Sequence, residues 1–352
     1  MSFNIKLNKQ AIILKIMKFK EASYYKKLSS KKVHCLLCPH DCFIENGEVG
    51  KCQVRMNVNG NLKSMFYGRP FIVKYLNSED IPLYHVLPRN KGLSFGIVGN
   101  NLFGELIEHK VAAYEEMQSI PMLSQYPDQI LREAVKTNAK MIFYGYSEPA
   151  MFYEYMKDTS ERAKKNPHGR NIKHIMVSHG FISKEAVQEL SQYIDAAVID
   201  IKGMNDELYD KFYNVKLTPI LDAVKTLKDN NVWIEIRFKV IPSFHNTLYD
   251  FRKLISWVVD NLGTNTPIHF MPYDYSNEEA VELTIKARKM ALNAGLHYVY
   301  TPKIKINEIN EGNITFCHNC RKQLIIRNLK DIENKIVEGR CQCGQEIPGI
   351  WQ

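Results

Sequence analysis

The chain has 352 residues, of which 45% are hydrophobic and 24% are charged, a composition typical of globular proteins. It contains no run of eighteen or more uncharged apolar residues, which argues against a transmembrane helix. Its start, MSFNIKLNKQ, is interrupted by lysines and is followed by no cleavage site of a signal peptide. We therefore expect a cytoplasmic protein.

The first segment, residues 1–32, is a basic arm. It carries most of the net charge of +9, and its apolar spacing predicts a helix over residues 9–28. Such an arm suits an acidic partner, such as RNA, an acidic protein or a membrane surface. The membrane is the least favoured of these, because the apolar face of the arm is short. The alternative is a solvated charged helix. The lysines concerned are Lys6, Lys9, Lys15, Lys18, Lys20, Lys26, Lys27, Lys31 and Lys32.

The second segment, residues 33–90, is a cysteine module followed by an extended stretch. Its cysteines have the spacing C-x2-C-x3-C-x9-C and are Cys35, Cys38, Cys42 and Cys52. Close cysteine spacing in a cytoplasmic chain favours a metal over disulfides. Four thiolates suit zinc, which we expect, and also an iron–sulfur cluster. Four protein ligands leave no open position, so a structural role is predicted. The VNGN stretch predicts a hairpin turn.

The third segment, residues 91–303, alternates strands with helices. The strands are mostly continuous apolar runs, as in buried parallel sheets. They are expected at 93–99, 141–146, 174–180, 196–203, 233–241, 267–273 and 297–302. Repeated β–α units predict a parallel sheet or barrel with its functional groups at the carboxyl ends of the strands.

The last segment, residues 304–352, contains CHNC, a 20-residue insert and CQCG. Two cysteine pairs joined by strands predict a zinc ribbon, in which the metal folds a module too small for its own core. The ligands are Cys317, Cys320, Cys341 and Cys343. His318 is a competing ligand, and a metal-free remnant is the alternative.

Several stretches together resemble one family. They include CLLCPHDCFIENGEVGKCQVRMN, LSFGIVGNNL, YSEPAMFYEY, AVIDIKG and CGQEIPGIW. The chain resembles, from residue 21 to 351, the radical SAM component of the AmmeMemoRadiSam system, which is related to pyruvate formate-lyase activating enzymes. The resemblance implies an α/β fold with a partial (β/α)6 TIM-like barrel, flanked here by the cysteine module and the ribbon.

The family places a C-x3-C-x2-C motif after its first barrel strand. There, three thiolates bind a [4Fe–4S] cluster, and S-adenosylmethionine (SAM) chelates the fourth iron. The corresponding residues here are Asn100, Gly104 and Ile107, and none can replace a soft thiolate. The resemblance thus implies a lost cluster. Glu105 and His109 share a helix face and suit a new metal site, but such residues are also ordinary on an exposed helix.

Other family positions are retained. Glu148, Asp200 and Lys202 match positions that resemble SAM contacts, which implies a vestigial SAM pocket. The alternative is that these residues form internal ion pairs. Two family patterns are replaced by HFMPYDYSNEEA and TPKIKINE, which weakens the case for SAM.

The expected function is a radical-SAM-fold pseudoenzyme that binds RNA or a ribonucleoprotein such as the ribosome. The ribbon adds basic residues for this purpose, namely Arg321, Lys322, Arg327, Lys330 and Arg340. One alternative is a SAM-dependent enzyme that is non-radical or receives its cluster ligands from a partner. Another is an adaptor for the other proteins of the AmmeMemoRadiSam system.

Overall fold

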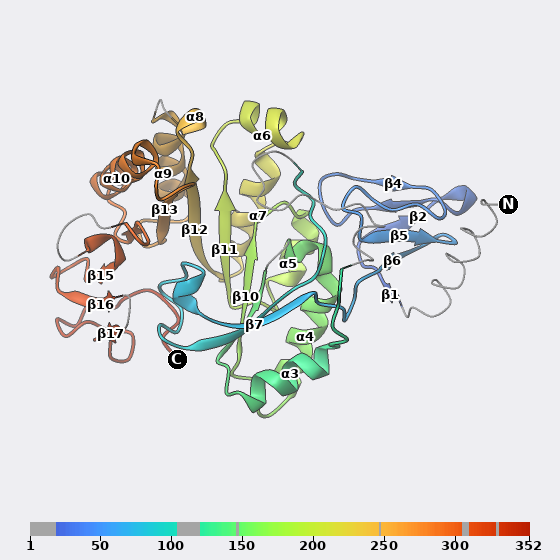
Figure 1. Ribbon diagram of the computed structural model, residues 1–352, viewed down its shortest axis with the longest axis horizontal. Helices are drawn as coiled ribbons and strands as arrows, with labels where there is room; N and C mark the ends of the chain where they lie inside the picture. The colour runs from blue at the N-terminus through green and yellow to red at the C-terminus, as the bar shows by residue number, and fades with distance from the viewer. Residues whose placement is uncertain (1–18, 104–119, 146–147, 246–247, 305–309, 329–330) are drawn as a thin grey trace.

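The centre of the computed structural model is an eight-stranded sheet in the order β14-β13-β12-β11-β10-β9-β8-β7 (Figure 1). The structure describes residues 19–103, 120–145, 148–245, 248–304, 310–328 and 331–352. The strands β8 to β14 run parallel to one another, and β7 is antiparallel to β8. All seven predicted barrel strands are therefore confirmed. The strand bounds are β7 (Ile72–Asn77), β8 (Lys91–Gly96), β9 (Met141–Tyr144), β10 (Lys173–Ser178), β11 (Ala196–Ile201), β12 (Trp233–Val240), β13 (Ile268–Pro272) and β14 (Val299–Tyr300).

Helices connect these strands, giving a mixed α/β fold with a mostly parallel sheet. Side-chain caps define several helix starts: the Asn277 side chain accepts the Ala280 amide of α10 at 2.8 Å, which satisfies one of the unpaired amides of the first turn. The helices are α3 (Pro127–Lys136), α4 (Tyr153–Lys165), α5 (Lys184–Leu190), α6 (Asp206–Tyr213), α7 (Thr218–Asp229), α8 (Pro242–His245), α9 (Tyr249–Asn261) and α10 (Glu278–Asn293). None of the helices in these described ranges is long and apolar enough to cross a bilayer.

The N-terminal module consists of two small antiparallel sheets, and for residues 19–28 it corrects the prediction of a helix over residues 9–28, whose first part lies outside the described residues. One sheet joins β1 (Lys20–Glu21), β6 (Asn61–Ser64) and β5 (Arg55–Val58), and the other joins β2 (Tyr25–Lys27), β3 (Val33–Cys35) and β4 (Phe43–Ile44). The described part of the predicted helix thus forms two short strands and the bend between them. Its backbone groups bond to distant strands, and Tyr24 has a φ of 57°, which a right-handed helix does not allow.

The hairpin predicted at VNGN is confirmed. Val58 pairs with Asn61 across the turn between β5 and β6. Asn59 and Gly60 both have positive φ, at 52° and 80°. Two such residues form the turn whose twist matches that of antiparallel strands.

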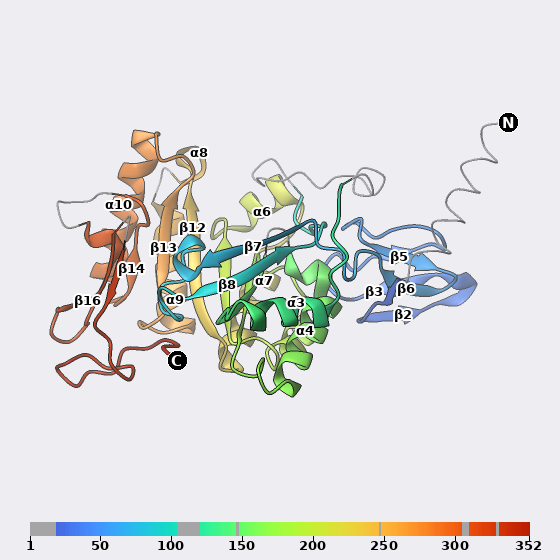
Figure 2. The ribbon, with the colours of Figure 1, turned by 60° about the horizontal axis from the view of Figure 1, so that its bottom comes forward.

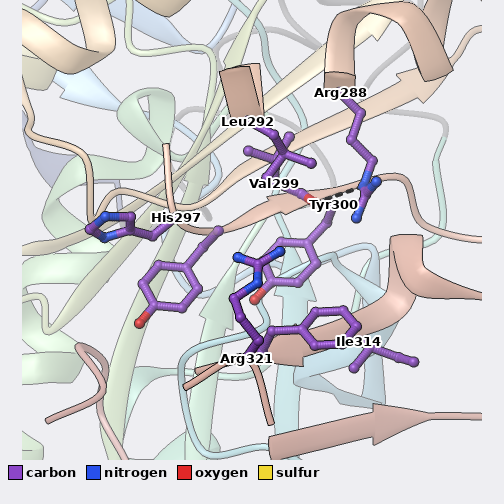
Figure 3. Close-up of a pocket in the computed structure, with 9 residues that line it drawn as sticks. Arg288, Leu292, His297, Val299, Tyr300, Ile314 and Arg321 are labelled. Atoms are coloured by element: carbon purple, nitrogen blue, oxygen red, sulfur yellow. Dashed lines mark hydrogen bonds between the residues drawn. The ribbon is translucent and has the colours of Figure 1, made fainter. Parts of the chain in front are cut away.

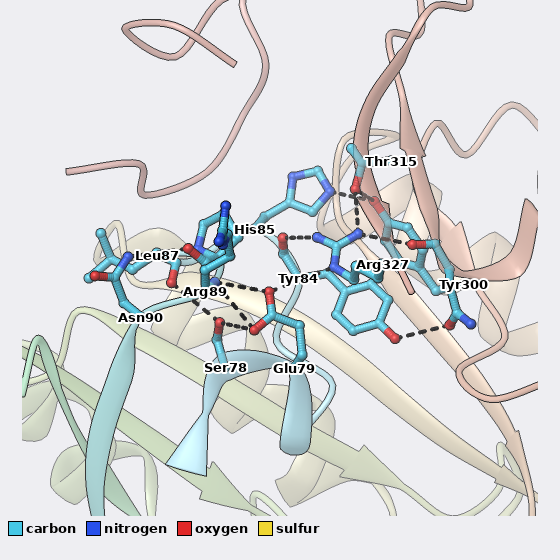
Figure 4. A network of polar contacts seen from close by, with 12 residues as sticks. Ser78, Glu79, Tyr84, His85, Leu87, Arg89, Asn90, Tyr300, Thr315 and Arg327 are labelled. Carbon is cyan, nitrogen blue, oxygen red and sulfur yellow. Dashed lines mark hydrogen bonds and ion pairs between the residues drawn. The ribbon is translucent and has the colours of Figure 1, made fainter. Parts of the chain in front are cut away.

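The C-terminal module is a three-stranded antiparallel sheet of β15 (Ile314–Phe316), β16 (Gln323–Arg327) and β17 (Ile332–Asn334). The ribbon views place it and the N-terminal module on opposite flanks of the main sheet (Figures 1 and 2). Arg327 attaches it to the barrel side (Figure 4): its guanidinium donates to Tyr84 O at 2.6 Å and to Thr315 Oγ1 at 2.9 Å. Because Arg327 is buried, it is not available to RNA, contrary to the prediction for this residue.

Candidate active site and metal centre

A polar cluster lies at the carboxyl ends of three neighbouring strands. Ser178 ends β10, Asp200 and Lys202 lie at the end of β11, and Arg237 lies in β12. Asp200 and Arg237 are direct cross-strand partners. The carboxyl edge of a parallel sheet is the usual place for a ligand in α/β folds, so this cluster is the candidate active site.

The Asp200 carboxylate is held by Arg237 in a two-point contact. Arg237 donates from Nε at 2.6 Å and from its terminal nitrogen at 2.7 Å. Burial by itself raises the pKa of Asp200, but the charges of Arg237 and Lys202 outweigh burial and hold that pKa well below its usual range. Asp200 is therefore ionised at neutral pH.

Lys202 and His179 face the same carboxylate without a hydrogen bond to it. Lys202 Nζ lies 3.8 Å from Asp200 Oδ2, and His179 Nδ1 lies 4.0 Å from it, both too far for a hydrogen bond. Within the described chain, His179 Nδ1 is buried with no hydrogen-bond partner. Burial lowers the pKa of His179 to about 3, so its ring is neutral. These two groups retain hydrogen-bonding capacity that an incoming ligand can use.

Glu148 lies beside this cluster but bonds to other groups. Its Oε1 accepts the Ser178 hydroxyl at 2.6 Å and the Ala150 amide at 3.1 Å, and its Oε2 accepts the His179 amide at 2.9 Å. It caps the 3-10 helix η3 (Pro149–Phe152) and ties the ends of β9 and β10 together. Burial raises its pKa to about 7. The structure therefore places Glu148, Asp200 and Lys202 at one edge, with a direct ion pair only between the last two.

Sequence reasoning missed Arg237, His179 and Ser178. Arg237 carried a signal, because a charged residue near the carboxyl end of the otherwise apolar strand WIEIRFKVI marks the functional edge of a parallel sheet. His179 and Ser178 carried no such signal, because their contacts with Glu148 and Asp200 depend on where the fold places them.

Asn100, the first of the three positions that the resemblance matched to cluster cysteines, lies in the loop after β8. Asn100 is buried, and its side-chain oxygen accepts the Leu102 amide at 3.0 Å. The next residue, Asn101, receives a hydrogen bond from His40 Nε2 at 2.7 Å through its carbonyl oxygen. The N-terminal cysteine module thus packs on this loop. Gly104, Ile107, Glu105 and His109 lie outside the described residues.

The C-terminal cysteines form a group that can hold a metal ion. The four sulfur atoms of Cys317, Cys320, Cys341 and Cys343 all lie within 4.8 Å of one another. The distances are 3.7 Å from Cys317 to Cys343 and 3.6 Å from Cys320 to Cys341. A zinc tetrahedron with bonds of about 2.3 Å has edges of about 3.8 Å, so the sulfur positions fit this ion. His318 is not part of the group, and it forms a hydrogen bond with the Tyr298 hydroxyl at 2.9 Å.

The N-terminal cysteines are less convergent. Among the described residues, the C-terminal group is the only set of three or more metal-ligating side chains whose ligand atoms lie within 4.8 Å of one another. Burial raises the pKa of Cys38 to about 12, and the neighbouring thiols Cys52 and Cys35 contribute to this rise. The thiols are therefore neighbours in one module, and zinc or an iron–sulfur cluster at Cys35, Cys38, Cys42 and Cys52 stays a prediction.

The described lysines of the basic arm are partly engaged by neighbours. Lys20 pairs with Asp158 at 2.6 Å, and Lys32 pairs with Glu45 at 2.5 Å. Lys27 donates to Asn61 at 2.7 Å. Lys6, Lys9, Lys15 and Lys18 lie outside the described residues. The described residues of the arm, 19–32, include β1 and β2 and belong to the N-terminal module.

Comparison with known proteins identifies several relatives. The profile of the Radical SAM superfamily matches residues 115–257. The chain is 33% identical over 338 residues to the uncharacterized protein MJ0808 of Methanocaldococcus jannaschii, covering 93% of this chain and 98% of that protein. It is 26% identical over 122 residues to the pyruvate formate-lyase 1-activating enzyme of Escherichia coli, covering 34% of this chain and 48% of that enzyme. A solved domain of a pyruvate-formate lyase-activating enzyme from Bacteroides vulgatus aligns with a TM-score of 0.35 at 17% identity, covering 42% of this chain and 92% of that domain.

Proposed function

Because this chain belongs to the radical SAM superfamily, we propose that it binds SAM at the carboxyl edge of its sheet without building a cluster on the loop after β8. Two observations support the missing cluster. Asn100 uses its side chain in a local turn, and the sequence provides no thiol at 104 or 107. The superfamily match begins at residue 115, beyond positions 100, 104 and 107. The protein is then a pseudoenzyme with respect to radical chemistry.

The polar cluster carries the proposal that SAM still binds. SAM bears an amino-acid group with one carboxylate and one ammonium, so it needs both a cation and an anion in its site. Lys202 provides a cation that is not hydrogen-bonded to Asp200. The ionised Asp200 provides the anion, because each of its oxygens accepts one hydrogen bond from Arg237 and keeps a second lone pair. The neutral ring of His179 adds an unused nitrogen. The donor set therefore fits the ends of this ligand.

Calorimetric titration with SAM tests the proposal. We expect heat of binding with the wild-type protein and binding weakened about tenfold or more in Lys202→Gln, because a charge-assisted hydrogen bond contributes about 1.5–3 kcal/mol. The control is Lys225→Gln, which changes an exposed lysine on α7 and should bind normally. Absence of heat with millimolar SAM in the wild-type protein would sink the proposal.

Metal analysis after anaerobic purification tests the missing cluster. We expect zinc and no iron in the wild-type protein. Iron that is lost in Cys38→Ser would locate a cluster in the N-terminal module, whereas iron retained in that variant would place it elsewhere. Either result would contradict the view that the cysteines serve only structural zinc.

RNA binding is a second candidate function. Arg321, Lys322 and Arg340 are exposed on the C-terminal module, in addition to the lysines at the start of the chain. Because phosphate contacts release counterions, affinity for single-stranded RNA should fall steeply between about 50 and 200 mM salt. Filter binding measures this, and an affinity that does not respond to salt would exclude binding through phosphates.

A further inference from the structure

A pocket lies where the last barrel helix meets the C-terminal module (Figure 3). Arg288 and Leu292 of α10 and Tyr300 of β14 form one side, and Ile314 and Arg321 of the C-terminal module form the other. Its empty volume of about 280 Å³ includes space open to solvent. Because that total counts solvent as well as the enclosed space, the enclosed part is much smaller and admits at most a small group of a larger molecule.

The described residues of the lining carry positive charge and include no acid. Among the described residues that line it are two arginines and His297, with apolar and aromatic side chains as the remainder. In Figure 3, Arg288 extends from the helix and Arg321 from the C-terminal module toward the same space beside Tyr300. Two cations that approach one pocket repel each other unless an anion lies between them.

The neighbouring groups compensate these charges only in part. Arg288 donates from Nε to Val299 O at 3.2 Å, and it forms an ion pair with Glu311 at 4.0 Å, which is beyond hydrogen-bond range. The Arg288 side chain is only 13% exposed. Burial lowers its pKa, Glu311 opposes this effect, and the charge of Arg321 lowers the pKa further. Arg288 is thus a largely buried cation beside a second cation.

Arg321 is fixed by the cysteine knuckle. Its amide donates to Cys317 O at 2.9 Å, its φ is 62°, and its guanidinium lies 5.9 Å from the centre of the Phe316 ring. His297 lies nearby, held by Asn265 at 2.8 Å and stacked on His318 at 4.4 Å. The Arg321 backbone and the His297 ring are therefore held in place, which reduces the entropy lost on binding.

We propose that this pocket binds a phosphate group carried by a nucleotide or by the end of an RNA chain. Two guanidinium groups match the charge and oxygen geometry of phosphate better than that of a single carboxylate. The aromatic side chains beside them suit an attached base or sugar. This inference is independent of SAM binding at the carboxyl edge, since the two sites share no residue.

Binding measured by calorimetry with the zinc-loaded full chain tests the inference, using inorganic phosphate, AMP, adenosine and an RNA oligonucleotide with a 5′-phosphate or a 5′-hydroxyl. We expect phosphate and AMP to bind and adenosine not to bind. Arg321→Gln should weaken binding about tenfold or more. Because Arg321 is exposed, this variant should still fold. The matched control, Lys289→Gln, changes an exposed lysine of α10 that does not line the pocket and should leave binding unchanged.

The ranking of ligands then identifies the source of the phosphate. Tighter binding of AMP than of the 5′-phosphorylated RNA indicates a free nucleotide, and the reverse order indicates an RNA end. Equal binding by the wild-type protein and Arg321→Gln would overturn the inference. Equal affinity for adenosine and AMP would also overturn it. So would equal affinity for RNA with a 5′-phosphate and RNA with a 5′-hydroxyl when neither AMP nor phosphate binds.

Discussion

Glu148 is a carboxyl group whose burial makes the stability of the protein depend on pH. Its folded pKa of about 7 lies above its usual 4.5, so between these values the folded state binds the proton more tightly than the unfolded state. The free energy of unfolding therefore falls as pH rises from 4.5 to 7. A shift from 4.5 to about 7 corresponds to about 3 kcal/mol.

We predict that Glu148→Gln removes this pH dependence. The variant loses one accepted hydrogen bond, so it should be less stable than wild type at pH 5. Relative to wild type, its free energy of unfolding should then rise by about 3 kcal/mol toward pH 8. Urea unfolding at several pH values measures the difference. Glu279→Gln, an exposed change on α10, is the control, and parallel pH curves for wild type and Glu148→Gln would contradict the prediction.

The same edge shows what individual residues reveal in a sequence. Glu148, Asp200 and Lys202 could be selected in advance because they lie at the ends of apolar strands and because the family resemblance pointed to them. Their pairing could not, because it depends on the register that places Asp200 opposite Arg237. The buried hydroxyl of Ser178 and the amide of His179 complete the environment of Glu148, and neither is visible in a pattern of residue types.

At the scale of elements, the barrel strands were predictable and the N-terminal strands were not. Strands such as β9 and β11 are buried along nearly their whole length, so their apolar runs are unmistakable. The strand β1 has two residues and pairs with Ser64 and Lys63, more than forty positions away. A local helical spacing over residues 9–28 therefore concealed pairing that only long-range contacts determine.

The C-terminal module gives a prediction for metal binding. Cys341→Ser should lose the ion, because three thiolates hold zinc less well than four. His318→Ala should keep it, since the His318 ring is bonded to Tyr298 and is not part of the sulfur group. Metal content by mass spectrometry tests both variants. Loss of the ion in His318→Ala would make this histidine a ligand.

The loss of the ion should loosen the module unevenly. Hydrogen exchange in Cys341→Ser should accelerate around the knuckles at 317–322 and 340–346, where the sulfur atoms meet. The end of β16 should remain protected, because Arg327 is bonded to Tyr84 and Thr315 independently of the ion. Uniform exchange over all three strands would show instead that the metal holds the whole module.

At the scale of the molecule, the N-terminal module is attached to the barrel by a buried ion pair. Arg55 of β5 and Glu154 of α4 are 1% and 3% exposed and lie 2.5 Å apart. Both side chains also bond to the backbone of Ser23. Arg55 donates to the Ser23 carbonyl oxygen at 2.9 Å, and Glu154 accepts the Ser23 amide at 2.7 Å. This pair joins the sheet β1-β6-β5 of the module to α4, the helix after β9.

We predict that Arg55→Met and Glu154→Leu are each strongly destabilising. The double substitution should lower the free energy of unfolding by much less than the sum of the two single losses. Arg55→Met leaves Glu154 as an unpaired buried charge, and Glu154→Leu leaves Arg55 unpaired, each at a cost of about 3–5 kcal/mol. Arg55→Met/Glu154→Leu removes both charges and replaces them with apolar side chains of comparable length. Urea unfolding of the four proteins measures the coupling, and limited proteolysis between residues 19 and 67 reports whether the module has detached. Additive losses, or single losses below about 1 kcal/mol, the range of exposed pairs, would mean that apolar contacts rather than this ion pair hold the module on the barrel.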